Sequence, residues 1–182
     1  MTDEAPDIAH DRYDFVEGQL ARVGDRDPLE ILRHTPGEVA AMLGRADQER
    51  IHRPWAPGKW TPAEILAHLA LTEWVFGFRT RTVLCDPDPV LQPVEQELWL
   101  ARAGLAVGEV VDHLQDFAAL RRANLRIWCR LTDAERERTG LHAEAGVPMT
   151  LGFLLRLLAG HDLNHLEQIG TGLSREGGPG ED

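Results

Sequence analysis

Two long segments of this chain repeat apolar residues every three or four positions. The first runs over 108–131 and the second over 150–172. Their stripes are Val110, Leu114, Phe117, Leu120, Ile127 and Leu131, and Leu151, Leu154, Leu158, His161, His165 and Ile169. This spacing places each stripe on one face of a helix. No segment shows a convincing strand alternation, so the pattern predicts an all-α protein.

Three tetrapeptides combine a polar cap, a proline and an acid, which is typical of a helix start. They are Asp27-Pro28-Leu29-Glu30, Thr35-Pro36-Gly37-Glu38 and Thr61-Pro62-Ala63-Glu64. In each, the first side chain accepts backbone N–H groups and the Glu reaches back to form a capping box. They predict a first helical region that breaks near Pro36. They also predict a helix over 62–84, ended by Asp86-Pro87-Asp88-Pro89.

Further helices are expected over 94–104, over 108–131 and from Pro148 and Thr150 to about 172. Four main helices must bury their apolar stripes together, which predicts a four-helix bundle over 25–172 with short additional helices. Residues 1–24 are expected to be an N-terminal extension with a short helix. Residues 173–182 are expected to be a disordered tail.

The composition bounds the partners of the chain. Its 182 residues are 43% hydrophobic and 27% charged, as in soluble globular proteins. No apolar run reaches the roughly 18 residues that span a bilayer, and the acidic N-terminus is not a secretory signal. We therefore expect a cytoplasmic protein without membrane contact, whose Cys85 and Cys129 are reduced. The net charge of −11 opposes contact with phosphate backbones, so no nucleic-acid partner is expected.

Three histidines are candidates for a metal site. His161 and His165 lie four residues apart, so their imidazoles share one helix face and continue its apolar stripe into the core. His68 lies on the 62–84 helix, on the side of Ile65 and Leu69. Two facing helices could thus bring three neutral imidazoles together at one divalent ion. The spacing leaves hydrogen-bonded core histidines open as the alternative.

Three polar residues are candidates for supporting such a site. Gln168 lies three residues after His165 and could orient that ligand or a bound water. Asn124 interrupts an apolar stripe, either to support a ligand or to bond the backbone. Glu64 lies one turn before His68 and could be a general base, although its place in the capping box favours the cap. His10, His34, His52 and His113 are expected on the surface, and no catalytic residue is predicted.

Two segments resemble the DinB/YfiT-like family of metal-dependent proteins. They are PWAPGKWTPAEILAHLALTEWVFGFR at 54–79 and TLGFLLRLLAGHDLNHLEQI at 150–169. The family pattern is G-K-W-[ST]-P, then a His, then H-x3-H followed by Q-I, and FAALRRANLRIWCRLTDAERERTG is also similar. The resemblance covers about 27–172. It implies an antiparallel four-helix bundle, often dimeric, in which His68, His161 and His165 bind one metal ion.

The expected function follows from that site. Three histidine ligands leave a metal ion with open positions, which is typical of catalysis. Zinc is the first expectation, with nickel, iron and manganese as alternatives. The resemblance implies an enzyme that transfers a low-molecular-weight thiol to small electrophilic substrates. A metal-dependent hydrolase at the same site and a non-catalytic, stress-related metal-binding homodimer are the alternatives.

Overall fold

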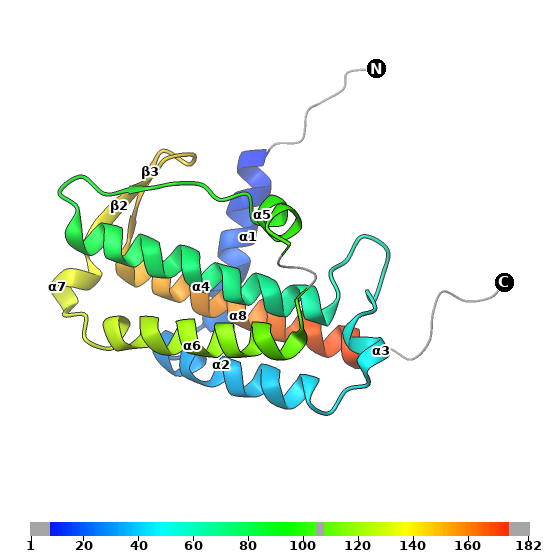
Figure 1. The fold of residues 1–182 in the computed structure, drawn as a ribbon. Coiled ribbons are helices and arrows are strands. Elements are labelled where there is room, and N and C mark those ends of the chain that lie inside the picture. The colour runs from blue at the N-terminus through cyan, green and yellow to red at the C-terminus, as the bar shows by residue number, and fades with distance from the viewer. Residues whose placement is uncertain (1–7, 105–107, 175–182) are drawn as a thin grey trace, which may run out of the picture.

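Four long helices form the body of the protein in a computed structural model that describes residues 8–104 and 108–174 (Figure 1). They are α2 (Pro28–Leu43), α4 (Pro62–Cys85), α6 (Val110–Trp128) and α8 (Leu151–Ser174). Helices α2 and α8 run in one direction, and α4 and α6 run in the opposite one (Figure 1). The predicted four-helix bundle is confirmed. The eight residues of the expected tail from 175 onward lie outside the described residues.

Short elements join the long helices. They are α3 (Gln48–Ile51), β1 (Val90–Leu91), α5 (Gln96–Arg102), α7 (Asp133–Arg136), β2 (Thr139–His142) and β3 (Val147–Thr150). Strand β1 pairs with β2 in parallel, and β2 pairs with β3 in antiparallel. The chain is nevertheless mostly helical, as predicted, and the small sheet is an addition that no alternation in the sequence indicated. Strands of two to four residues are too short for alternation to stand out from their surroundings.

The capping residues set the ends of the two helices that matter most for the site. At α4 the Thr61 hydroxyl accepts the Glu64 N–H at 3.1 Å, and the Glu64 carboxylate accepts the Thr61 N–H at 2.8 Å. This helix was predicted to within one residue. Helix α8 begins at Leu151, where the Thr150 hydroxyl accepts the Phe153 N–H at 3.0 Å. Pro148, which we expected to open this helix, lies in β3 instead.

Pro36 does not break the first bundle helix. Helix α2 runs through it without interruption. A proline inside a helix has no N–H for the carbonyl four residues earlier, here that of Leu32. The Arg121 guanidinium on α6 donates to this carbonyl at 2.7 Å. A side chain from a neighbouring helix thus supplies the missing donor, which no local sequence pattern indicates.

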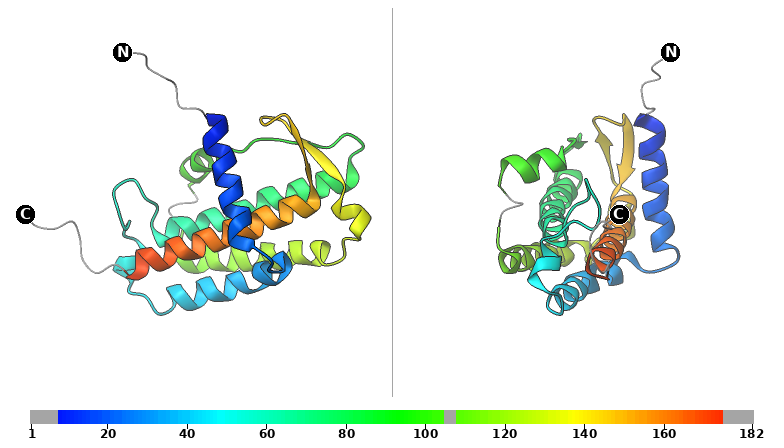
Figure 2. Two further views of the ribbon diagram at one scale, coloured as in Figure 1. Left: turned by 180° about the vertical axis from the view of Figure 1, so that it is seen from behind. Right: turned by 90° about the vertical axis from the view of Figure 1, so that its right-hand side faces the viewer.

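Helix α1 (Ile8–Val23) lies outside the bundle and crosses α8 (Figure 2). The crossing depends on Gly160, because a Cβ there would overlap the backbone carbonyl of Gln19. The hydrophobic core forms two main clusters, with Leu158 and Trp128 in one and Phe117 and Ile169 in the other. Within the described residues, no helix has the length and apolarity needed to cross a membrane.

Candidate metal centre

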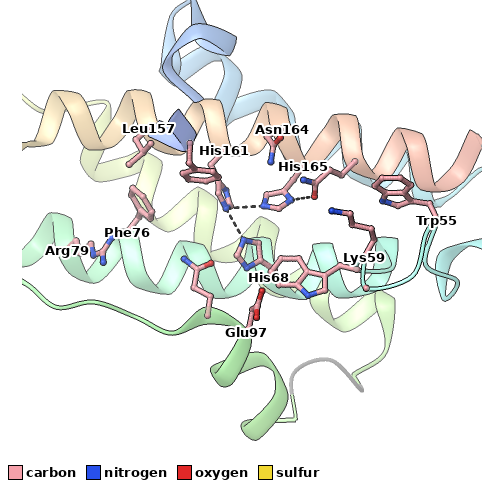
Figure 3. Close-up of a pocket in the computed structure, with 15 residues that line it drawn as sticks. Trp55, Lys59, His68, Phe76, Arg79, Glu97, Leu157, His161, Asn164 and His165 are labelled. Atoms are coloured by element: carbon pink, nitrogen blue, oxygen red, sulfur yellow. Dashed lines mark hydrogen bonds between the residues drawn. The ribbon is translucent and has the colours of Figure 1, made fainter. Parts of the chain in front are cut away.

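His68, His161 and His165 meet in the middle of the bundle. His68 comes from α4, and the other two come from successive turns of α8. All three are at least nine-tenths buried. Their Nε2 atoms converge: that of His161 lies 2.9 Å from that of His68 and 3.1 Å from that of His165 (Figure 3). The structure thus brings together the three histidines that were expected to meet across two facing helices.

Burial lowers the pKa of all three imidazoles. The pKa of His68 falls to about 3, mainly because burial disfavours its charged form and also because His165 lies beside it. The pKa of His165 falls to about 4 through burial, although its bond with Gln168 acts in the opposite direction. Burial, followed by the neighbouring His165 and His68, holds the pKa of His161 well below its ordinary value. The rings are therefore neutral near pH 7, which is the form that binds a metal ion.

The arrangement fits a divalent ion. Zinc takes histidine nitrogens at about 2.1 Å, so tetrahedral ligand atoms stand about 3.4 Å apart. The ring nitrogens of the cluster face one another at 2.9 and 3.1 Å, and one ligand atom of each residue lies within 4.8 Å of the others. The cluster could therefore hold a metal ion. Its lack of thiolate and carboxylate ligands suits borderline metals of the zinc, nickel and iron group.

Two neighbours fix the orientation of the rings. The Gln168 side-chain oxygen lies 2.9 Å from His165 Nδ1. When Nδ1 carries the proton and donates to this oxygen, the Nε2 lone pair is left facing the other two rings. The Trp60 ring packs against His68 at 4.7 Å between centroids and stacks over His165 at 6.3 Å. Gln168 thus favours this tautomer of His165, and Trp60 restricts the ring planes of His165 and His68.

The other two supporting candidates lie elsewhere. The Glu64 carboxylate accepts the Thr61 N–H of the capping box, as its position in the sequence favoured. Asn124 is buried and donates to the Glu73 carboxylate at 3.0 Å and to the Glu73 carbonyl at 2.9 Å. The Asn124 side-chain oxygen accepts from Arg81 of α4 at 3.0 Å. Asn124 therefore supports a polar layer beside the histidines.

That layer is a buried ionic network that the sequence analysis missed. Arg121 donates to both oxygens of Asp162, at 2.7 and 3.0 Å, and lies 3.0 Å from a Glu73 oxygen. All three residues are almost fully buried. Burial, followed by the charge of Asp162, raises the pKa of Glu73 despite the opposing effect of Arg121. The signal in the sequence was that charged residues occupy positions in the predicted helices where buried residues are expected. Asp162, directly after His161, is one of them.

Of the remaining histidines, one was placed wrongly. His113 is buried rather than on the surface, and its ring packs against Gly108, which lies just before α6. His34 and His52 are exposed as expected, and His142 is the last residue of β2. The side chain of His10 lies outside the described residues.

A cavity of about 530 Å³ opens onto the three histidines. Arg79, Phe76 and Leu157 line it on one side of the cluster, and Lys59 and Trp55 line it on the other (Figure 3). Its size is that of a small-molecule site. All three histidines line this cavity, so a small molecule in it would lie beside the cluster.

Comparisons with known proteins agree with this geometry. A "Putative metal-dependent hydrolase" of Bacillus licheniformis is 24% identical over 177 residues, covering 92% of this chain and 98% of its own. The "Putative metal-dependent hydrolase YfiT" of Bacillus subtilis is 24% identical over 154 residues, covering 82% and 84%. These names match the hydrolase alternative and give no support to thiol transfer.

The fold is also shared. A solved structure titled "YfiT from Bacillus subtilis is a probable metal-dependent hydrolase with an unusual four-helix bundle topology" superposes with a TM-score of 0.74. The match covers 79% of this chain and 82% of that one, at 20% sequence identity. The model of the DinB superfamily matches residues 31–169, which include all three clustered histidines. The chain therefore belongs to the DinB superfamily.

Proposed function

We propose that this protein is a metal-dependent hydrolase of small molecules and that His68, His161 and His165 hold its ion. The observation that carries the proposal is the convergence of three neutral, buried Nε2 atoms at the floor of an open cavity. The names of the relatives support the same reading. A divalent ion there supplies Lewis acidity, which activates water or polarises a carbonyl near neutral pH.

The residues of the chain account for the rest of the site. The low pKa values of the imidazoles keep them available as ligands without competition from protons. Gln168 holds His165 in the tautomer that presents Nε2. The Trp60 ring covers His68 and His165 and shields them from solvent on that side. Cavity residues from α4, α5 and α8 are left to select the substrate.

Metal content tests the site. The protein is purified without a chelator or an affinity tag and analysed for elements. We expect one divalent ion per chain in the wild type and close to none in the His161→Ala, His165→Ala double variant. The matched control is His34→Ala, His52→Ala, because both residues are exposed and neither belongs to the cluster. Equal metal content in wild type and the first double variant would rule the site out.

Hydrolysis tests the activity. Wild-type protein is screened against carboxylic esters and amides before and after chelation, with metal restored in a third arm. We expect turnover that is lost on chelation and recovered with metal. A parallel screen with a reactive electrophile and glutathione, cysteine, bacillithiol or mycothiol addresses thiol transfer. Consumption of a thiol without ester or amide turnover would overturn the hydrolase proposal.

A further inference from the structure

The cavity beside the three histidines contains a cation whose charge the described part of the protein leaves unneutralised. The Arg79 guanidinium lines this cavity, and its Nε is buried without a hydrogen-bond partner among the described residues. Its Nη2 donates to the Gln92 carbonyl at 2.9 Å. Its ring contact is with Phe76, 5.7 Å from the guanidinium carbon to the centroid. Among the described residues, no carboxylate forms an ion pair with it.

Arg79 lacks the carboxylate partners that the buried arginine Arg121 has among the described residues. Burial lowers the pKa of Arg79, and within the described parts of the chain no carboxylate offsets the effect. Arg121, by contrast, is more deeply buried but has Asp162 and Glu73 as partners. A partly desolvated cation without a counter-ion is unfavourable unless a ligand supplies one. The guanidinium fork binds a carboxylate with two parallel hydrogen bonds, and Nε is one of its donors.

The charged residues around the cavity also favour an anionic ligand. The whole chain carries 30 acidic side chains against 19 Lys and Arg. Arg79 and Lys59, the only lysine of the chain, nevertheless both line this cavity, and Glu97 supplies the one carboxylate among the described residues of its lining. Lys59 lies 5.8 Å from the Trp55 ring. The local balance therefore favours an anionic guest in a protein that otherwise repels anions.

The position of Arg79 defines the length of that guest. Arg79 follows His68 by three helical turns on α4, about 16 Å of rise. Both side chains lean toward the N-terminus of the helix, so the distance along α4 between guanidinium and imidazole stays near this rise of about 16 Å. Phe76 and Leu157 line the interval (Figure 3). The surface thus runs from a cation, over apolar side chains, to the three histidines.

We propose that Arg79 binds the carboxylate of the substrate, so that the enzyme acts on small half-esters or half-amides of dicarboxylic acids with an apolar spacer. The inference rests on the proposed hydrolase function for the reaction, but not for the binding step. In the reaction, the acyl–oxygen or acyl–nitrogen bond breaks. Water supplies a hydroxyl group to the acyl carbon and a proton to the leaving alcohol or amine, and Arg79 holds the far end.

Binding to the metal-free protein is the first test. The probes are monomethyl suberate, which has one carboxylate and a spacer of about the right length, and dimethyl suberate, its neutral counterpart. Isothermal titration calorimetry should show that the wild type prefers the half-ester. Arg79→Met should weaken half-ester binding by about 10- to 100-fold, as loss of a charge-assisted hydrogen bond implies, and leave the diester unchanged. Arg79→Lys should recover part of the loss, because it keeps the charge without the fork.

The control variant is Arg126→Met, which removes the same charge from an exposed position on α6. It should bind both probes as the wild type does. Circular dichroism confirms that each variant is folded, and Arg79→Lys serves if Arg79→Met is not. Equal affinity of the wild type for half-ester and diester, no measurable half-ester binding, or an unchanged half-ester affinity in both Arg79 variants would overturn the proposal.

The second test uses metal-loaded protein and follows methyl ester hydrolysis by NMR. The ratio of kcat/KM for half-ester over diester should fall about 10- to 100-fold in Arg79→Met, mainly through KM. Hydrolysis of both esters with an unchanged ratio would overturn the role of Arg79 and leave the hydrolase proposal standing. Selective half-ester binding without any hydrolysis would support the role of Arg79 and overturn the hydrolase proposal.

Discussion

Arg121 and Asp162 form a bidentate ion pair in the centre of the bundle, one residue from His161. The guanidinium Nη1 and Nη2 lie 2.7 and 3.0 Å from the two carboxylate oxygens. Both side chains are almost completely removed from solvent. The pair therefore joins α6 to the turn of α8 that carries the histidine.

Loss of one partner of this pair should be costly. Asp162→Asn leaves the Arg121 charge buried with weaker compensation, and we expect a loss of about 3–5 kcal/mol in the free energy of unfolding. Glu73→Gln should cost clearly less, because burial raises the pKa of Glu73 toward its neutral form, which Gln resembles. Urea unfolding measures both. Glu167→Gln, in the exposed pair with Arg22, is the control and should change stability by under about 1 kcal/mol. A ranking with Glu73→Gln as the most destabilising would contradict this account.

Gln168 should affect metal affinity without affecting the fold. Gln168→Leu removes the acceptor 2.9 Å from His165 Nδ1, so the ring loses its fixed tautomer. We expect metal affinity to fall about 10- to 100-fold, measured by competition with a chromogenic chelator. Gln96→Leu is the matched control, because Gln96 lines the same cavity from α5. Similar losses in both variants would show that cavity polarity, and not the bond to His165, sets the affinity.

The metal-free protein should lose stability in mild acid. The pKa values of His68 and His165 in the folded state, about 3 and about 4, lie below their ordinary value. As the pH falls, the unfolded chain therefore takes up these protons first. Stability is fully present above about pH 6.5 and falls as the pH drops toward 4, by on the order of 2 kcal/mol per histidine at pH 5. Chemical unfolding at pH 7 and pH 5, after chelation, measures the loss. The His68→Gln, His165→Gln variant should show a smaller difference, and an equal one would refute the assignment.

The homodimer expected from the sequence stays a prediction. Trp74 and Phe78 lie one turn apart on α4, each 65% exposed, which is unusual for large aromatic side chains. Light scattering should give twice 20.3 kDa across a range of concentrations. A Trp74→Ser, Phe78→Ser variant should move the mass toward one chain. A monomer mass for the wild type at every concentration would contradict the prediction.

The helices and the three histidines could be predicted because their signals are local. Helix α4 begins at a capping box and ends at an Asp-Pro pair, so residues adjacent to each end determine where the helix begins and ends. His161 and His165 share a face through helical spacing alone. The partnership with His68 needed only the assumption that two apolar faces meet.

The ionic layer and the unbroken α2 could not be predicted because they depend on contacts distant in sequence. The residues around Pro36 predict a helix break there. The donor that the Leu32 carbonyl needs comes instead from Arg121, 85 positions after Pro36 in the chain. Likewise, Glu73 lies 3.0 Å from Arg121, 48 positions later in the chain, and within the described residues it forms no ion pair with Arg79 on its own helix. Arg79 is thereby left to face the cavity. Arg79 is available for a ligand because the fold places Glu73 beside Arg121 instead.

The Arg121 side chain also has a consequence for how the bundle forms. It extends from α6 and contacts the Leu32 carbonyl of α2, Glu73 of α4 and Asp162 of α8. A partly folded state that lacks any one of these helices leaves a buried charge or carbonyl without its partner, which raises the free energy of every such intermediate. The four helices should therefore gain protection from hydrogen exchange together, at one common opening free energy. We therefore expect the four helices to form and to unfold cooperatively, because one guanidinium contacts a group from each of the other three.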